Sequence, residues 1–121
     1  MNFRLLITGF VLLALQSCYY DSEEELYPLS VCDTTEVSYS GDVIPVFETH
    51  CYSCHNNSTA ASFGENIRLE NFEDVAYYAG NGSLYGSVAW IAPWSAMPDY
   101  KLDKCSQNRI KAWVDQGMKQ N

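Results

Sequence analysis

Basic side chains are scarce in this sequence. Lys and Arg number seven against fifteen Asp and Glu, which gives a formal charge of −8 over 121 residues. Nucleic-acid binding needs a basic surface that neutralises phosphates, so this balance argues against a nucleic-acid partner. Strand patterns are weak and internal repeats are absent, so a sheet or a repeat array is not expected. The length suits one domain, and an apolar content of 47% is too high for general disorder.

The sequence also has no apolar run long enough to cross a bilayer. Its most apolar stretch, residues 5–15, follows a short basic start, whereas a membrane-spanning helix needs about 20 residues. This pattern is typical of a secretory signal. It ends in Leu15-Gln16-Ser17-Cys18, which resembles the lipobox of bacterial lipoproteins except at Gln16. The resemblance implies a cleaved signal peptide over residues 1–17 and lipidation of Cys18. The alternative is ordinary cleavage near Ser17 with a free Cys18 thiol.

An acidic stretch without periodicity follows the expected lipid anchor. Residues 19–25 include Asp21 and three consecutive glutamates. Such a run is typical of a solvated tether. We therefore expect residues 18–39 to form an acidic tether and linker, and residues 40–121 to form the folded domain. The expected location is a bacterial cell envelope, lipid-anchored at the periplasmic face or the cell surface, with the anchor as the one membrane contact.

The folded part is predicted to be all-α. Residues 56–66 are expected to form a loop, because they are rich in Asn, Ser, Ala and Gly. Residues 90–100 contain Pro93 and Pro98 and cannot be regular helix. The first expected helix is capped by Ser40 or Asp42, has Pro45 in its first turn and runs into Cys51. The others are a segment capped by Asn71 that ends at Gly80 or Gly82, residues 83–89, and a last helix from Asp103 or Ser106 to Gly117.

The motif that carries chemistry is C-x-x-C-H, formed by Cys51, Cys54 and His55. This spacing is the signature of c-type haem attachment. Two thiols on one turn can add to the two vinyl groups of a porphyrin, and the following imidazole is then placed as an axial iron ligand. Covalent attachment retains the cofactor on an exported protein. The motif therefore predicts one covalently bound haem c per chain.

Three other interpretations of the motif remain open. A thioredoxin-like redox pair needs a βαβ setting, which the sequence lacks. A zinc site needs a second Cys or His pair at ligand spacing, and Cys32 and Cys105 lie far apart in the sequence. The third interpretation is a simple disulfide between Cys51 and Cys54.

A second axial ligand is expected from later in the chain. Met97 precedes Pro98 in an irregular segment, where proline stiffens the chain and helps to present a side chain at a fixed place. Met118 lies near the chain end and is expected to fray. His50 adjoins Cys51 and cannot easily reach the opposite porphyrin face. Met97 is therefore the preferred iron ligand, and its alternative role is that of a gap-filling side chain.

With these features the sequence resembles a class I cytochrome c over roughly residues 40–117. The resemblance implies a small all-α fold in which the first and last helices pack beside the haem. It further implies that Val43 and Phe47 meet Ile110 and Trp113. The implied function is single-electron transfer with His/Met ligation, not enzymatic catalysis. The acidic charge favours redox partners with basic docking surfaces.

Two further interpretations of the whole chain stay open beside the electron carrier. One is a haem module of a larger oxidoreductase or a haem-based sensor. The other is a binding lipoprotein without haem that uses its cysteines only in disulfides.

Two cysteines, Cys32 and Cys105, have no role in the lipid or haem sites. Unpaired thiols in an oxidising compartment are most simply joined, so a disulfide between them is expected. The alternative is a pair of buried free thiols.

Overall fold

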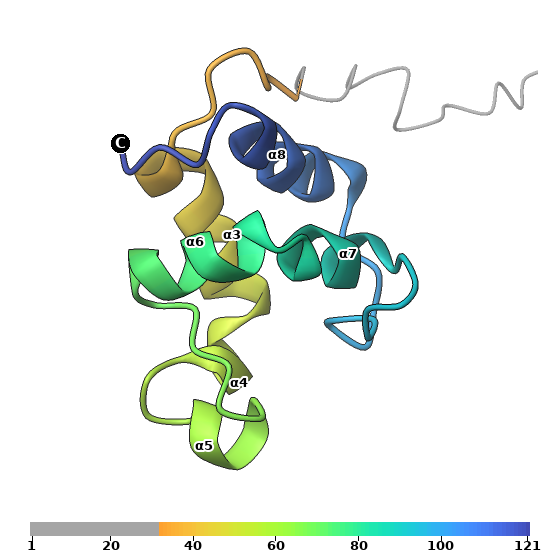
Figure 1. Ribbon diagram of the computed structural model, residues 1–121. Helices are drawn as coiled ribbons and strands as arrows, with labels where there is room; N and C mark the ends of the chain where they lie inside the picture. The colour runs from red at the N-terminus through yellow and green to blue at the C-terminus, as the bar shows by residue number, and fades with distance from the viewer. Residues whose placement is uncertain (1–31) are drawn as a thin grey trace, which may run out of the picture. The chain divides into compact units, whose positions relative to one another are not determined.

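Helices are the only regular secondary structure in the part of the chain that the structure describes. The computed structural model describes residues 32–121, so the expected signal peptide, the lipidation site Cys18 and the first part of the tether lie outside the described residues. No strand occurs between residues 32 and 121, which confirms the all-α class. The elements, in chain order, are η1 (Tyr39–Val43), α3 (Ile44–His50), α4 (Tyr52–His55), α5 (Ala60–Phe63), α6 (Phe72–Gly80), α7 (Ser83–Ala89) and α8 (Lys104–Asp115) (Figure 1).

None of the helices between Cys32 and Asn121 combines the length and apolar character needed to cross a membrane.

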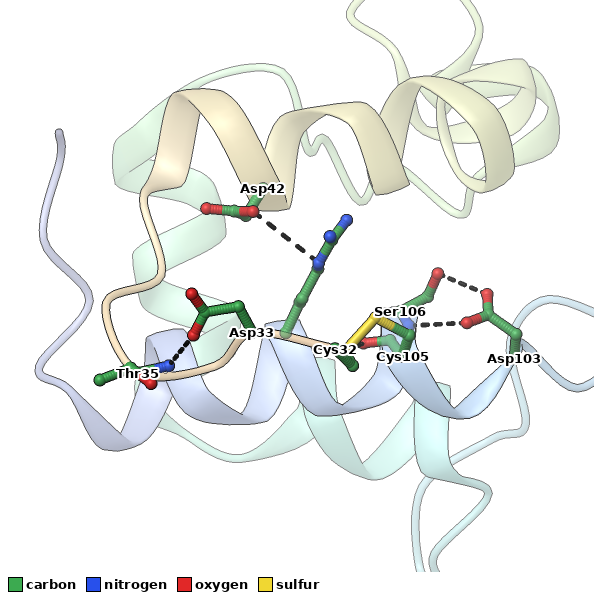
Figure 2. Close-up of a disulfide and its surroundings, with 8 residues drawn as sticks. Cys32, Asp33, Thr35, Asp42, Asp103, Cys105 and Ser106 are labelled. Atoms are coloured by element: carbon green, nitrogen blue, oxygen red, sulfur yellow. Dashed lines mark hydrogen bonds and ion pairs between the residues drawn. A yellow bond between two sulfur atoms is a disulfide. The ribbon is translucent and has the colours of Figure 1, made fainter. Parts of the chain in front are cut away.

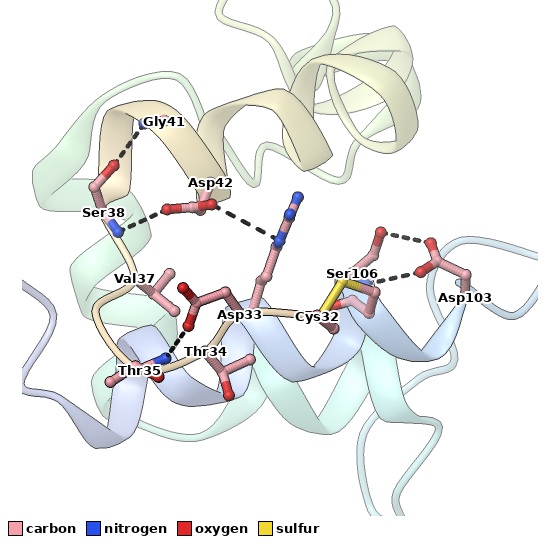
Figure 3. A network of polar contacts seen from close by, with 12 residues as sticks. Cys32, Asp33, Thr34, Thr35, Val37, Ser38, Gly41, Asp42, Asp103 and Ser106 are labelled. Carbon is pink, nitrogen blue, oxygen red and sulfur yellow. Dashed lines mark hydrogen bonds and ion pairs between the residues drawn. A yellow bond between two sulfur atoms is a disulfide. The ribbon is translucent and has the colours of Figure 1, made fainter. Parts of the chain in front are cut away.

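The first helix starts earlier than its sequence pattern indicates. Its first turn, η1, has π-helical hydrogen bonding and continues directly into α3. The Ser38 hydroxyl accepts a hydrogen bond from the Gly41 N–H at 2.8 Å, and the Ser38 N–H donates to the Asp42 carboxylate at 2.9 Å (Figure 3). These reciprocal bonds satisfy free donors at the helix start. Tyr39, expected in the linker, is therefore helical, and both Tyr39 and Val37 are buried in the core.

The core forms where the first helix meets α8. Val43, Phe47, Ile110 and Trp113 are all fully buried in one apolar cluster, so the residues expected at this contact do lie together in the core. The Tyr39 ring adds to the contact, with its centroid 5.2 Å from that of Trp113. In Figure 1, α8 lies beside α7, with which it is in contact, whereas α4 and α5 lie beyond the end of α3.

A disulfide joins Cys32 to Cys105 and confirms the expected pairing. The two Cα atoms are 5.4 Å apart, and the bridge links the approach to η1 with the first turn of α8 (Figure 2). Asp103 caps α8 by accepting a hydrogen bond from the Ser106 N–H at 2.9 Å. This hydrogen-bonded pairing with Ser106 lowers the pKa of the Asp103 carboxyl. The helix starts at Lys104 because this cap precedes it.

The remaining segments follow their sequence patterns with one exception. The helix α6 ends at Gly80, and α7 follows after a turn in which Gly82 has a φ of 83°. Residues 56–66 were expected to form a loop. This prediction is wrong in part, because the short helix α5 lies within them. Residues 90–103 form no helix, as the prolines predict, and this segment extends from α7 on the side away from α8 (Figure 1).

Candidate cofactor site

The C-x-x-C-H motif lies at the break between α3 and α4. The Cys51 N–H closes the last turn of α3 by donating to the Phe47 carbonyl at 2.8 Å. The Cys51 carbonyl in turn accepts hydrogen bonds from the N–H groups of Cys54, at 3.1 Å, and His55, at 2.9 Å. One tight turn therefore carries both thiols and the imidazole, as attachment to a single flat cofactor requires.

The two thiols differ in environment and are not bonded to each other. Cys51 belongs to the apolar core and is 8% exposed, whereas Cys54 is half-buried, and both are free cysteines. Burial raises the pKa of the Cys51 thiol to about 12, so this group is a neutral thiol at neutral pH.

The orientation of His55 is set by a backbone carbonyl. Its Nδ1 atom lies 3.0 Å from the carbonyl oxygen of Ile67. A carbonyl only accepts hydrogen bonds, so Nδ1 carries the proton and the Nε2 lone pair is left for another partner. Two residues further on, the Leu69 N–H donates to the His55 carbonyl at 2.9 Å. Metal-binding histidines are commonly oriented in this way, with the second ring nitrogen donating to a carbonyl or carboxylate.

A glycine packs directly against the motif. A Cβ atom at Gly64 would lie 2.5 Å from the Cys54 carbonyl oxygen and 2.8 Å from His55 Nδ1. Both distances are shorter than normal van der Waals contact, so only glycine lets the backbone after α5 approach so closely. Sequence analysis did not identify Gly64 or Ile67 as site residues. The sequence offers one indication of their role, which is that both residues closely follow the motif in a segment that contains Asn and Gly.

Substituting Gly64 with alanine is therefore expected to lower the free energy of unfolding by about 1–3 kcal/mol, the usual cost of overpacking a tight contact. The matched control is Gly80→Ala at the end of α6, where the nearest atom to an added Cβ would be the Met118 methyl at 3.9 Å. Alanine is the better helix former, so this control should unfold with equal or higher free energy. Chemical denaturation of both variants checks the pair. Equal stability of Gly64→Ala and the parent would contradict the close packing.

Met97, the expected second ligand, lies in an exposed apolar segment that is far from the motif in the sequence. The Met97 side chain is 42% exposed, and its N–H donates to the Ser87 carbonyl of α7 at 3.1 Å. The Trp94 ring packs onto the Gly86 backbone, in the space that a Cβ atom there would fill. The large exposed apolar side chains of this segment are Trp90, Ile91, Trp94, Met97 and Tyr100. Five large exposed apolar side chains within eleven residues of sequence make this segment a candidate for contact with a ligand or partner.

The two alternative ligands are engaged elsewhere. Met118, expected to fray, is instead half-buried and packs against the core. His50 Nδ1 lies 2.8 Å from the Tyr100 hydroxyl. Of the three candidates, Met97 therefore has the most available side chain. No hydrogen bond within residues 32–121 links Met97 itself to Cys51, Cys54 or His55.

Two further observations concern metal-binding clusters and cavities. Among residues 32–121, no three His, Cys, Asp or Glu side chains come close enough together to hold a metal ion by themselves. On the turn at residues 51–55, two free thiols and one imidazole nitrogen are the donor set that a covalently attached haem would need. A hollow of about 540 Å³ between residues 35–38 and the chain end shares no residue with the motif.

Comparison of the chain with protein-family models, with curated proteins and with solved structures finds no match in any of the three. The function is therefore inferred from the residues of the site.

Proposed function

We propose that this chain is an extracytoplasmic, lipid-anchored, mono-haem c-type cytochrome that carries single electrons between redox partners. The observation that carries the proposal is the orientation of His55. Its Nδ1–H donates a hydrogen bond to the Ile67 carbonyl, so the Nε2 lone pair is left for a ligand on the turn that also presents two free thiols.

Four residues would hold the cofactor. Cys51 and Cys54 would form the two thioether bonds, and His55 and Met97 would be the axial ligands. Bound haem would supply an iron that changes between the ferric and ferrous states and so carries one electron. Cys51 would tie the cofactor to the core, because its own side chain is part of that core. The fold would then be that of a small cytochrome c.

The chain's residues favour electron transfer over catalysis. With His55 and Met97 both acting as ligands, the protein leaves no iron position open for a substrate. The exposed apolar side chains of residues 90–100 would exclude water from one side of the cofactor. A sensor or an enzyme would need one of these positions to be vacant, so the identity of the second ligand separates the candidate functions.

Substituting Met97 with alanine is expected to leave the haem attached, because the thioether bonds do not depend on it. The reduction potential should fall by something on the order of 0.2 V, within the range of about 0.8 V that axial ligands set, because the thioether ligand favours ferrous iron. The ferric protein should also lose the far-red absorption band typical of methionine ligation. Redox titration and absorption spectra check both effects, with Met118→Ala as the matched control. An unchanged potential in Met97→Ala together with a lowered one in Met118→Ala would transfer the role to Met118.

The acidic charge near the motif favours redox partners that have a basic docking surface. Glu48, Glu65 and Glu70 are exposed and lie within sixteen residues of Cys54 in the sequence. Together with the net charge of −8, they would steer a positively charged docking surface toward this end of the molecule. Association with such a partner should weaken as salt concentration rises.

The proposed membrane attachment depends on Cys18, which lies outside the described residues. Substituting Cys18 with alanine is expected to move the protein from the membrane fraction to the soluble fraction, since stable anchoring needs more than one acyl chain. Haem content should not change, because Cys51 and Cys54 are intact. Ser17→Ala is the matched control and should remain membrane-bound. A Cys18→Ala protein that still sediments with membranes would rule out the lipidation site.

A further inference from the structure

One hydrogen bond connects the segment that carries Met97 to the helix that presents the motif. It joins the Tyr100 hydroxyl to His50 Nδ1 at 2.8 Å, and the two rings meet edge to face with centroids 5.8 Å apart. Within the described residues, no other hydrogen bond or ion pair links residues 90–103 to residues 44–69. The contact is therefore the one polar link between the two halves of the candidate site.

The other attachments of this segment lead to different helices. Near its start, the Ile91 N–H donates to the Gly86 carbonyl of α7 at 2.8 Å. At its end, the Leu102 carbonyl accepts a hydrogen bond from the buried Gln107 side chain of α8 at 2.6 Å. Between them, the Met97 N–H donates to the Ser87 carbonyl of α7 at 3.1 Å. These bonds hold the segment to α7 and α8, but they do not tie it to α3.

His50 is held firmly in place and can therefore fix the position of Tyr100, near the end of the segment. It is the last residue of α3 and immediately precedes Cys51, which is buried in the core. Tyr100 is three residues from Met97, a span of at most about 10 Å in an extended chain. While Tyr100 is bonded to His50, the Met97 backbone therefore stays within about 10 Å of a residue that is held at the end of α3.

We propose that His50 and Tyr100 are positioning residues, whose hydrogen bond presents Met97 to the haem iron. This inference rests on the proposed function and deepens it. Neither residue touches the iron in the proposal. Their role is to tie the segment, which is otherwise held only to α7 and α8, to the end of α3, so that less ordering would be needed for Met97 to reach a bound haem.

The test uses the exported holoprotein and imidazole as a competing iron ligand. Tyr100→Phe keeps the ring and removes the hydroxyl. Imidazole should bind the ferric variant roughly two- to tenfold more tightly than the parent, the range that the net contribution of one hydrogen bond implies, and the far-red band should weaken. Haem staining should stay at the parent level. The matched control is Tyr77→Phe, since the exposed Tyr77 has no hydrogen bond from its hydroxyl within residues 32–121.

Variants at His50 complete a double-mutant cycle. His50→Ala should raise imidazole affinity as much as Tyr100→Phe, and the double variant should show no further increase. His50→Gln offers a partner for the Tyr100 hydroxyl and should restore affinity toward the parent. Parent-like imidazole affinity in Tyr100→Phe, or fully additive effects in the double variant, would overturn the inference.

A second readout separates this inference from the proposed function. The Met97 N–H is bonded to the Ser87 carbonyl, so its hydrogen exchange reports the order of the segment whether or not haem is attached. In the full exported chain, Tyr100→Phe should speed exchange across residues 90–100 by roughly two- to tenfold, and Tyr77→Phe should not. A parent chain without haem would refute the proposed function, whereas unchanged exchange in Tyr100→Phe would refute the positioning role.

Discussion

Substituting Cys51 and Cys54 together with alanine is expected to abolish covalent haem. Each thiol is the attachment point for one vinyl group, so either single variant retains at most one thioether and the double variant retains none. Haem staining of a denaturing gel, which removes non-covalently bound cofactor, measures this directly. The single variants should stain weakly and the double variant should not stain at all.

The matched control for this experiment is Cys32→Ser/Cys105→Ser, which also removes two cysteines but leaves the motif intact. It should keep covalent haem, because its bridge joins the approach to η1 with the start of α8 and includes neither motif cysteine. Immunodetection of each variant separates loss of haem from loss of protein. Haem staining that survives in Cys51→Ala/Cys54→Ala would show that the attachment site lies elsewhere.

Removing the disulfide between Cys32 and Cys105 is expected to cause the largest loss of stability. The bridge spans 73 residues of sequence, and in the chain-entropy model closing a loop of this size contributes on the order of 4 kcal/mol. A domain of about 90 residues has little apolar burial to spare. The Cys32→Ser/Cys105→Ser variant should therefore melt roughly 15–30 °C below the parent, given the usual conversion for a domain of this size.

Single variants provide the control for the bridge. Cys32→Ser and Cys105→Ser should each lose about as much stability as the double variant, because either substitution opens the same loop. Thermal unfolding followed by circular dichroism, with and without a reducing agent, measures the effect. The reducing agent should destabilise the parent but not the double variant. A double variant that unfolds within about 1 kcal/mol of the parent would contradict a stabilising role for the bridge.

Local signals were sufficient to predict most of the helices. The acids that open α6, the glycine that ends it, and the Asp103 cap of α8 act within one turn of chain, so they can be read from sequence alone. The start of the first helix was harder to predict. The Ser38 cap is local, but the Tyr39 ring is also held by packing against Trp113, which lies 74 residues further along the chain. That partner is not visible in the local pattern.

The candidate site shows the same division between local and non-local information. The C-x-x-C-H spacing is local and identified Cys51, Cys54 and His55 without a structure. The carbonyl of Ile67 and the close approach of Gly64 depend on how the chain turns after α5. The hydrogen bond between His50 and Tyr100 joins residues 50 positions apart. Residues that orient the motif therefore emerged only from tertiary contacts.

The central claim, that this chain carries covalent haem, is tested most directly by a pyridine haemochrome assay. The full-length protein should be produced with haem-maturation machinery, purified from the membrane fraction and extracted with acidified acetone to remove loosely bound cofactor. The account predicts the spectrum of haem c at one haem per chain, retained after extraction. A protein that is exported and folded, with its disulfide formed, but gives no haemochrome spectrum would contradict the account.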